Sequence, residues 1–125
     1  MLRECARVLK PGGILAGYLI HTTPGLSDAE EELACELGPS SVSGASSPHA
    51  LFKEAGLELV TCEDLTEDFR KTCRALGSAR DALEVELREA EGDEIYEEER
   101  RKEVDMRRGM DGGLLVRSLL VARKA

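Results

Sequence analysis

Apolar residues recur at helical spacing at the start of the chain, where Leu2, Cys5 and Leu9 share one face. Charged side chains separate them, so one side of this helix can be buried while the other stays in water. Pro11 prevents the helix from continuing, and the two glycines after it supply the backbone angles of a turn. The apolar run at residues 14–20 then predicts a strand covered on both faces, as in a parallel sheet.

Polar residues after that strand carry the signature of a helix start. Ser27 and Glu30 have the spacing of a capping box, in which each side chain accepts a hydrogen bond from the other residue's backbone amide. We therefore expect a short acidic helix that ends near Leu37, just before a Gly-Pro pair. Residues 40–47 are rich in serine and predict a flexible loop.

A second helix start follows the serine-rich segment. Pro48 comes directly after a serine, and proline in the first turn costs no hydrogen bond. The helix is expected to end at Gly56. Residues 57–65 then predict a strand whose side chains alternate between its two faces.

The long charged segment at residues 67–108 has only an intermittent apolar stripe. Gly77 and Gly92 are the expected breaks, with Ser78 as a cap of the middle piece, so two or three helical pieces are predicted. A glycine-rich turn then leads into a final strand at residues 114–124.

The string Arg-Val-Leu-Lys-Pro-Gly-Gly at residues 7–13 resembles the end of the helix before the fifth strand in class I S-adenosylmethionine-dependent methyltransferases. Residues 51–60 resemble the next helix and sixth strand of that family, and residues 114–124 its closing strand. The resemblance implies an α/β class, a partial Rossmann-like methyltransferase fold with flanking helices. About three strands are implied, in a mixed sheet whose last strand is antiparallel and lies between the other two.

The same resemblance implies a single domain over residues 1–125, the C-terminal portion of a methyltransferase domain, with a helical insertion at residues 66–112. The family's Gly-x-Gly loop and ribose-binding acid are not in the sequence. We therefore expect a substrate-side fragment of a small-molecule methyltransferase that is inactive alone. S-adenosylmethionine is the cofactor implied for the complete fold, with weak or no binding by this chain.

Composition narrows the classes of partner. The formal net charge is −8 and aromatic residues make up 3% of the chain, which disfavours nucleic acid and anionic membranes. No apolar run is long enough to span a bilayer, and the charged N-terminal helix is not a signal peptide. Four scattered cysteines without a Cys-x-x-Cys pair suggest buried free thiols in a cytoplasmic protein, not a metal site.

Candidate substrate-pocket residues lie where the first strand ends. His21 could act as a base for a substrate hydroxyl or amine, and Thr22 and Thr23 could hydrogen-bond a substrate. A histidine bonded to backbone or water and two turn-forming threonines are the structural alternatives. Tyr96 in the helical insertion could cover a substrate, or simply pack between helices. No residue is assigned as the catalytic base, because methyl transfer demands mainly alignment of the acceptor with the methyl group.

Two other functions are compatible with the sequence. The first is a non-catalytic interaction module that self-associates through an exposed strand edge at residues 13–20, because an unpaired apolar edge promotes association. The second is another nucleotide-binding α/β enzyme in which the Lys-Pro-Gly-Gly turn is coincidental.

Overall fold

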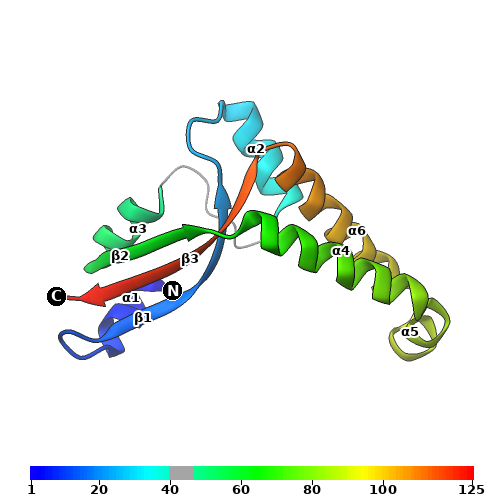
Figure 1. Ribbon diagram of the computed structural model, residues 1–125, viewed down its shortest axis with the longest axis horizontal. Helices are drawn as coiled ribbons and strands as arrows, with labels where there is room; N and C mark the ends of the chain where they lie inside the picture. The colour runs from blue at the N-terminus through cyan, green and yellow to red at the C-terminus, as the bar shows by residue number, and fades with distance from the viewer. Residues whose placement is uncertain (40–46) are drawn as a thin grey trace.

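A three-stranded sheet carries helices on one side and a long helical hairpin at one end (Figure 1). The computed structural model describes residues 1–39 and 47–125, so the loop predicted at 40–47 lies almost wholly outside the described residues. In chain order the elements are α1 (Leu2–Val8), β1 (Ile14–Thr22), α2 (Asp28–Leu37), α3 (Pro48–Glu54), β2 (Leu57–Asp64), α4 (Thr66–Ala82), α5 (Glu84–Glu91), α6 (Asp93–Asp111) and β3 (Leu115–Lys124).

The last strand of the chain is the central strand of the sheet. The strand order is β1-β3-β2, and β3 runs antiparallel to both neighbours. Ile14 lies opposite Arg123 in the first pairing, and the second pairing shifts register at a bulge around Val60. The predicted fold class, with an antiparallel last strand between the other two, is confirmed.

The turn between α1 and β1 is joined to the far end of β3. Gly12 has φ of 76°, a left-handed conformation that favours glycine, and its amide donates to the Lys124 carbonyl at 2.8 Å. The Lys124 amide donates to the Gly13 carbonyl at 2.9 Å, and its Nζ donates to the Leu9 carbonyl at the end of α1 at 2.8 Å. These bonds hold the predicted helix, turn and strand against the last strand.

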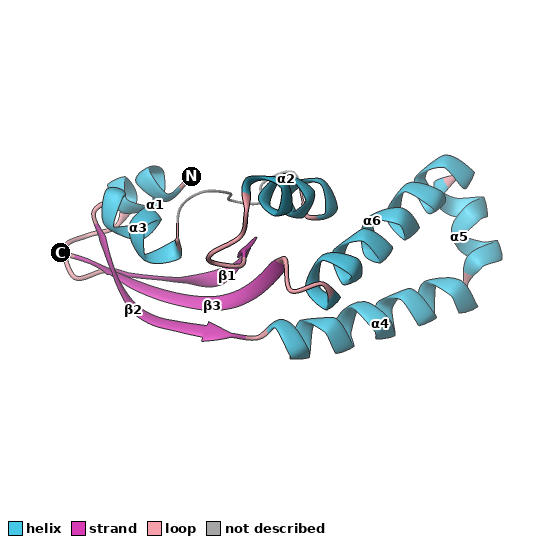
Figure 2. Cartoon of the chain, turned by 90° about the horizontal axis from the view of Figure 1, so that it is seen from above, coloured by secondary structure: helices cyan, strands magenta, loops and turns pink. Residues whose placement is uncertain are grey.

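Helices α1 and α3 cover one face of the sheet (Figure 2). Their apolar sides meet alternate residues of the three strands, and Leu15 and Leu19 of β1 pack at the margin of this cluster. Its buried members are Ala6, Phe52, Leu57, Leu120 and Ala122. The amphipathic helix predicted at the start of the chain is therefore confirmed, with its apolar side against the sheet.

The opposite face of β1 is open from Ile14 to Tyr18, so the expectation of a strand covered on both faces is wrong for this part of the strand. Ile14 is 50% exposed and Tyr18 is 62% exposed. The Arg117 guanidinium lies over the Tyr18 ring, 4.3 Å from the ring centroid. Helices α1 and α3 lie on the other side, and farther along the open face Ile20 is partly buried against the cluster that contains Met110 and Leu115.

The helical insertion forms a hairpin that projects beyond the sheet (Figures 1 and 2). Its three helices fit the predicted number, and the break expected at Gly92 is confirmed. The other break falls at Leu83, because α4 continues through Gly77. Gly77 lies where α6 comes close, since a Cβ there would be 3.1 Å from the Glu103 carboxyl group. Because α4 continues through this glycine, Ser78 lies inside the helix and caps nothing.

A second apolar cluster joins the hairpin to the sheet, with buried members Ala34, Cys73, Met110 and Leu115. Gly109 of α6 faces the start of β3, where a Cβ would come within 2.9 Å of Leu115 Cγ and still closer to Cδ1. Residue 109 must therefore be small for the hairpin to reach β3. The predicted capping box of α2 is present, with Ser27 and Glu30 exchanging hydrogen bonds at 3.2 Å.

Candidate functional site

The C-terminal ends of β1 and β2 meet the start of β3 at the hairpin end of the sheet. Ser118 of β3 pairs with Leu19 on one side and with Asp64 on the other, so it lies in the middle of this end. Polar side chains from all three strands and the start of α4 gather here. We call the group the strand-end cluster; it consists of His21, Thr22, Thr23, Asp64, Thr66 and Ser118.

His21 is buried at 6% exposure, and both ring nitrogens have partners. Nδ1 lies 3.0 Å from the Thr22 carbonyl oxygen, and Nε2 lies 3.0 Å from Ser118 Oγ. A carbonyl oxygen only accepts, so the contact with Thr22 assigns a proton to Nδ1, and Nε2 faces the Ser118 hydroxyl. The lone pair that a base would use therefore faces the Ser118 hydroxyl.

Asp64 and Thr66 close the end of β2. The Asp64 carboxylate accepts from the Thr66 hydroxyl at 2.5 Å and from the Thr66 amide at 2.9 Å. These two bonds, with a smaller contribution from His21, hold the pKa of Asp64 below its usual range against the opposing effect of burial. Thr66 Oγ1 also accepts from the Arg117 amide at 3.1 Å, which ties the start of α4 to β3.

The two threonines have different surroundings. Thr22 is buried at the last position of β1. Thr23 is half-buried, with its hydroxyl donating to the Gly113 carbonyl at 2.5 Å and its amide to the Leu114 carbonyl at 3.0 Å. The structure thus brings His21, Thr22 and Thr23 together, and the bonds of Thr23 fix the turn before β3.

Tyr96 lies apart from this cluster, in the first turn of α6 near α5. Its ring is 1% exposed, with the Arg88 guanidinium 4.3 Å and the Arg80 guanidinium 5.4 Å from the ring centroid. Burial, followed by the negative charges of Glu84 and Asp81, raises the pKa of the Tyr96 hydroxyl. These contacts hold the hairpin together at the end far from the sheet (Figure 2).

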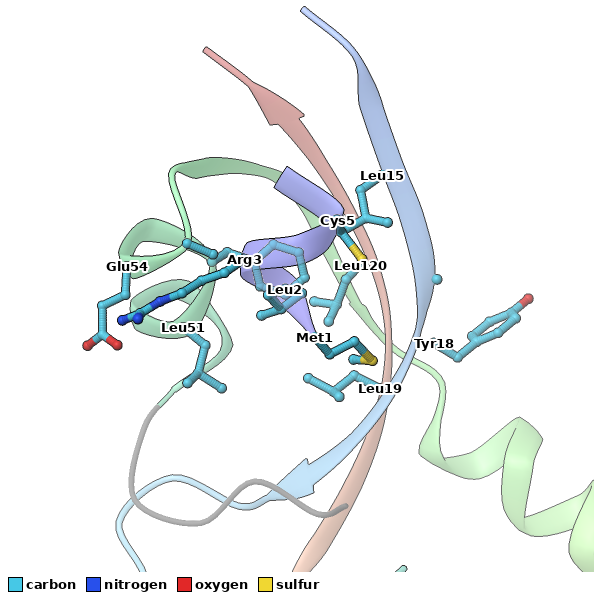
Figure 3. A pocket seen from close by; sticks show the side chains of 13 residues that line it. Met1, Leu2, Arg3, Cys5, Leu15, Tyr18, Leu19, Leu51, Glu54 and Leu120 are labelled. Atoms are coloured by element: carbon cyan, nitrogen blue, oxygen red, sulfur yellow. The ribbon is translucent and has the colours of Figure 1, made fainter. Parts of the chain in front are cut away.

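Sequence reasoning missed an apolar cavity of about 490 Å³ between α1, α3 and the strands (Figure 3). Leu15, Leu19 and Leu120 form its strand side, and Arg3 and Glu54 supply its charged groups. Tyr18 also borders this region, but its ring points to the other side of β1 (Figure 3). Gly17 in the middle of an apolar strand was the available signal, because it leaves space where a side chain would be.

The described residues do not fit an S-adenosylmethionine site. Gly12-Gly13 precedes β1 and Gly112-Gly113 precedes β3, whereas a cofactor-cradling glycine loop follows a strand and opens a helix. In residues 1–39 and 47–125, no three histidine, cysteine or acidic side chains are grouped so that they could hold a metal ion. Nor does any helix within those ranges have the length and apolarity to cross a membrane.

Solved structures of the same fold include several methyltransferases. A candidate sarcosine dimethylglycine methyltransferase from Galdieria sulphuraria matches 99% of this chain over 46% of its own, with 19% identity and a TM-score of 0.82. The match to the mycolic acid cyclopropane synthase CmaA1 covers 98% of this chain and 51% of the synthase chain, with 16% identity and a TM-score of 0.78. An N-methyltransferase from Haemonchus contortus, in complex with phosphomonomethylethanolamine and S-adenosylhomocysteine, matches 98% over 29%, with 14% identity and a TM-score of 0.74.

This chain spans about half the length of the first two of these proteins. No protein-family model matches the sequence, and no curated protein matches it. At identities below 20%, these likenesses show that the chain has the fold of part of a Rossmann-like methyltransferase, as the resemblance at residues 7–13 implies. They leave the activity to be argued separately.

Proposed function

We propose that this chain is the substrate-side part of an S-adenosylmethionine-dependent methyltransferase that acts on a small molecule, and that it has no activity alone. The observation that carries the proposal is the match of nearly the whole chain to methyltransferase structures about twice its length. The string at residues 7–13 and the central last strand support it independently.

Within this proposal, His21, Thr22 and Thr23 belong to the substrate side, because they lie at the carboxyl end of β1, where open α/β sheets bind ligands. A base role for His21 requires that the Ser118 hydroxyl relay a proton or turn away from Nε2. Tyr96 has an indirect role in this proposal: it packs between the helices of the insertion and so stabilises the shape of the hairpin.

Calorimetric titration of the chain with S-adenosylmethionine is the first test. We expect no micromolar binding, because no Gly-x-Gly loop follows a strand among the described residues. S-adenosylhomocysteine serves as a second probe, and circular dichroism verifies that the titrated chain is folded. Micromolar binding of either compound would contradict the claim that the chain is incomplete.

A chimera tests the methyltransferase assignment itself. The segment of the Galdieria protein that matches this chain is replaced by residues 1–125, and the remainder of that protein is kept. We expect the folded chimera to regain micromolar S-adenosylmethionine binding, and the matched control is the unaltered Galdieria protein. A folded chimera without cofactor binding would count against the proposal.

Transfer is measured separately from binding, because the same fold also serves other chemistry. The [4+2]-cyclase SpnF matches 98% of this chain, with 20% identity and a TM-score of 0.66. Small amines and alcohols are offered to the chimera as acceptors, and His21→Gln is compared with the unaltered chimera across pH. A base role predicts a lower rate with loss of the acidic limb of the pH profile, whereas a purely structural role lowers stability without moving that limb.

The second candidate is a non-catalytic interaction module. The observation that favours it is the edge of β1, which pairs with no other strand among the described residues besides β3.

A further inference from the structure

Helix α4 begins at a residue type that is poorly suited to start a helix. Its N-cap is Leu65, which makes no side-chain hydrogen bond to the first turn. Serine, threonine, aspartate and asparagine are preferred at this position, and α2 and α3 follow the preference with a serine each. A departure from a local rule indicates that the neighbouring side chains serve another purpose.

That purpose is a connection to the central strand. The Leu65 amide donates to the Arg117 carbonyl of β3 at 2.8 Å, so the pairing of β2 with β3 extends one residue beyond Asp64. An antiparallel pair of this kind ordinarily exchanges two bonds, and the second would run from the Arg117 amide to the Leu65 carbonyl. That carbonyl instead accepts from the Phe69 amide at 3.0 Å, in the first turn of α4.

Thr66 supplies the acceptor that Arg117 would otherwise lack. Its Oγ1 accepts from the Arg117 amide at 3.1 Å and donates to the Asp64 carboxylate at 2.5 Å. The same carboxylate accepts from the Thr66 amide at 2.9 Å. The hydroxyl therefore stands in for a strand carbonyl at the point where the chain changes from strand to helix, and it is bonded on both sides.

The second leg of the hairpin is fixed at the same end of the sheet (Figure 2). The Thr23 amide donates to the Leu114 carbonyl at 3.0 Å, and its hydroxyl donates to the Gly113 carbonyl at 2.5 Å. Arg70 of α4 forms an ion pair with Asp111, the last residue of α6, at 3.1 Å. The two legs are therefore tied to the strands and to each other.

Small changes at this base are amplified along the hairpin. Helix α4 has 17 residues, which corresponds to a length of about 25 Å. A tilt of about 10° at its first residue would move its far end by about 4 Å. The direction of the hairpin is therefore sensitive to the way in which α4 joins β3.

The joint is part of the strand-end cluster. Arg117 precedes Ser118 in β3, and Ser118 Oγ lies 3.0 Å from His21 Nε2. We propose that Thr66 is a positioning residue: its hydroxyl fixes the direction in which the hairpin leaves the central strand. This direction sets where the hairpin stands relative to His21 and Ser118, at the end where open α/β sheets bind ligands. The effect on a substrate rests on the proposed function, whereas the joint itself does not.

Replacement of single hydroxyl groups on α4 tests this role. Thr66→Val keeps the shape of the side chain and removes both of its hydroxyl bonds. Thr66→Ser and Thr72→Val are the two controls. The first keeps the hydroxyl, and the second removes a hydroxyl that bonds within the same helix, to the Asp68 carbonyl at 3.1 Å. Circular dichroism verifies that each variant is folded.

Hydrogen exchange of the Arg117 amide reports the joint directly. Thr66→Val leaves this amide without its acceptor, so its exchange should become at least about tenfold faster. Both controls should exchange at the wild-type rate. The Leu120 amide, farther along β3, is the internal reference and should keep its protection in every variant.

Spin labels measure the direction of the hairpin. One label is placed on the native Cys62 of β2 and the other on Glu89→Cys in α5, both at exposed positions. Cys5→Ser and Cys35→Ser remove competing thiols, and Cys73 is buried. The distance between the labels should be narrowly distributed in the wild type and both controls, and shifted or broadened by about 4 Å when the hydroxyl at position 66 is lost.

The chimera with the Galdieria protein tests the consequence for transfer. Thr66→Val should lower kcat at least about tenfold, because misplacement of groups around a substrate is costly, and should leave the Kd for S-adenosylmethionine unchanged. Thr66→Ser should restore kcat. A chimera that binds no cofactor would refute the proposed function, and the exchange and distance measurements on the chain alone would still decide the role of Thr66.

A folded Thr66→Val chain with the wild-type exchange rate at Arg117 and the wild-type label distance would overturn the assignment. So would equal changes in Thr72→Val, which would trace them to a general loss of helix stability. A lower kcat in Thr66→Val with an unchanged label distance would also contradict it. If Thr66→Val does not fold, Thr66→Ala removes the same hydroxyl with a smaller side chain, and the same results are expected from it.

Discussion

Alanine at position 109 tests how tightly the hairpin packs on the sheet. In an exposed helix interior, replacing glycine by alanine stabilises a protein by up to about 1 kcal/mol. Here the new Cβ would lie 2.9 Å from Leu115 Cγ and closer to Cδ1, and Leu115 is only 1% exposed. Overpacking of a buried site costs about 1 to 3 kcal/mol, so the steric term should exceed the gain in helix propensity.

We therefore expect Gly109→Ala to lower the free energy of unfolding by about 1 to 2 kcal/mol. Gly77→Ala is the matched control within α4. Its Cβ would meet the Glu103 carboxyl group at 3.1 Å, the far end of a flexible side chain that can move. That variant should be neutral or more stable by up to about 1 kcal/mol.

Urea unfolding followed by far-UV circular dichroism measures both variants, with the m-value as a check on two-state behaviour. Leu115→Ala removes the atoms that the new methyl group meets, so Gly109→Ala should cost less in that background, by at least about 0.5 kcal/mol. If Gly109→Ala is as stable as the wild type and shows no coupling to Leu115, the reasoning about this contact is refuted.

Three further outcomes follow from local contacts. Ser27→Ala should cost about 1 kcal/mol in urea unfolding, because the capping box is lost, and an unchanged midpoint would contradict the role of the cap. The pKa of Asp64 is lower in the folded chain than in the unfolded chain. Its ionised carboxylate therefore contributes to stability in full above the unfolded pKa, and this contribution is lost as the pH falls through the folded pKa. Asp64→Asn should therefore be less stable than the wild type at neutral pH, and the difference should shrink below about pH 4; a pH-independent difference would argue against this linkage. With a thiol reagent, exposed Cys35 and Cys62 should react promptly and Cys73 slowly, since burial lowers its access and raises its pKa; equally fast reaction of Cys73 would contradict its burial.

Sequence reasoning succeeded where the cause of structure is local. The capping box at Ser27, the proline that starts α3 and the Lys-Pro-Gly-Gly turn each act over a few neighbouring residues. The central position of β3 came from the family resemblance, because a pattern of apolar residues does not state which strands are neighbours.

The failures share a tertiary cause. Glycine at position 77 predicts a helix break, but α4 continues through it where the helix packs against α6, which carries Glu103. An apolar run does not reveal whether one face or two will be covered, and Tyr18 is therefore exposed against expectation. The prediction of buried thiols is wrong for Cys35 and Cys62, which are exposed, and confirmed for Cys73.

For the candidate site, position along the chain indicated His21 and its two threonines but not their partners. Ser118 follows His21 by 97 residues and meets it only when β3 is in place. The surroundings of Tyr96 were equally hidden, because Arg80 and Arg88 reach its ring from two other helices of the hairpin.

The position of β3 governs the order of assembly during synthesis. β1 and β2 are not neighbours in the sheet, and each pairs with a strand that the ribosome makes after both of them. Until residues 115–124 emerge, neither flanking strand has its β3 partner, and the leucines beneath α1 and α3 have no Leu120 to pack against. β1 and β2 therefore wait, exposed on that side, for residues 115–124, and a stop codon before these residues would prevent this three-stranded arrangement.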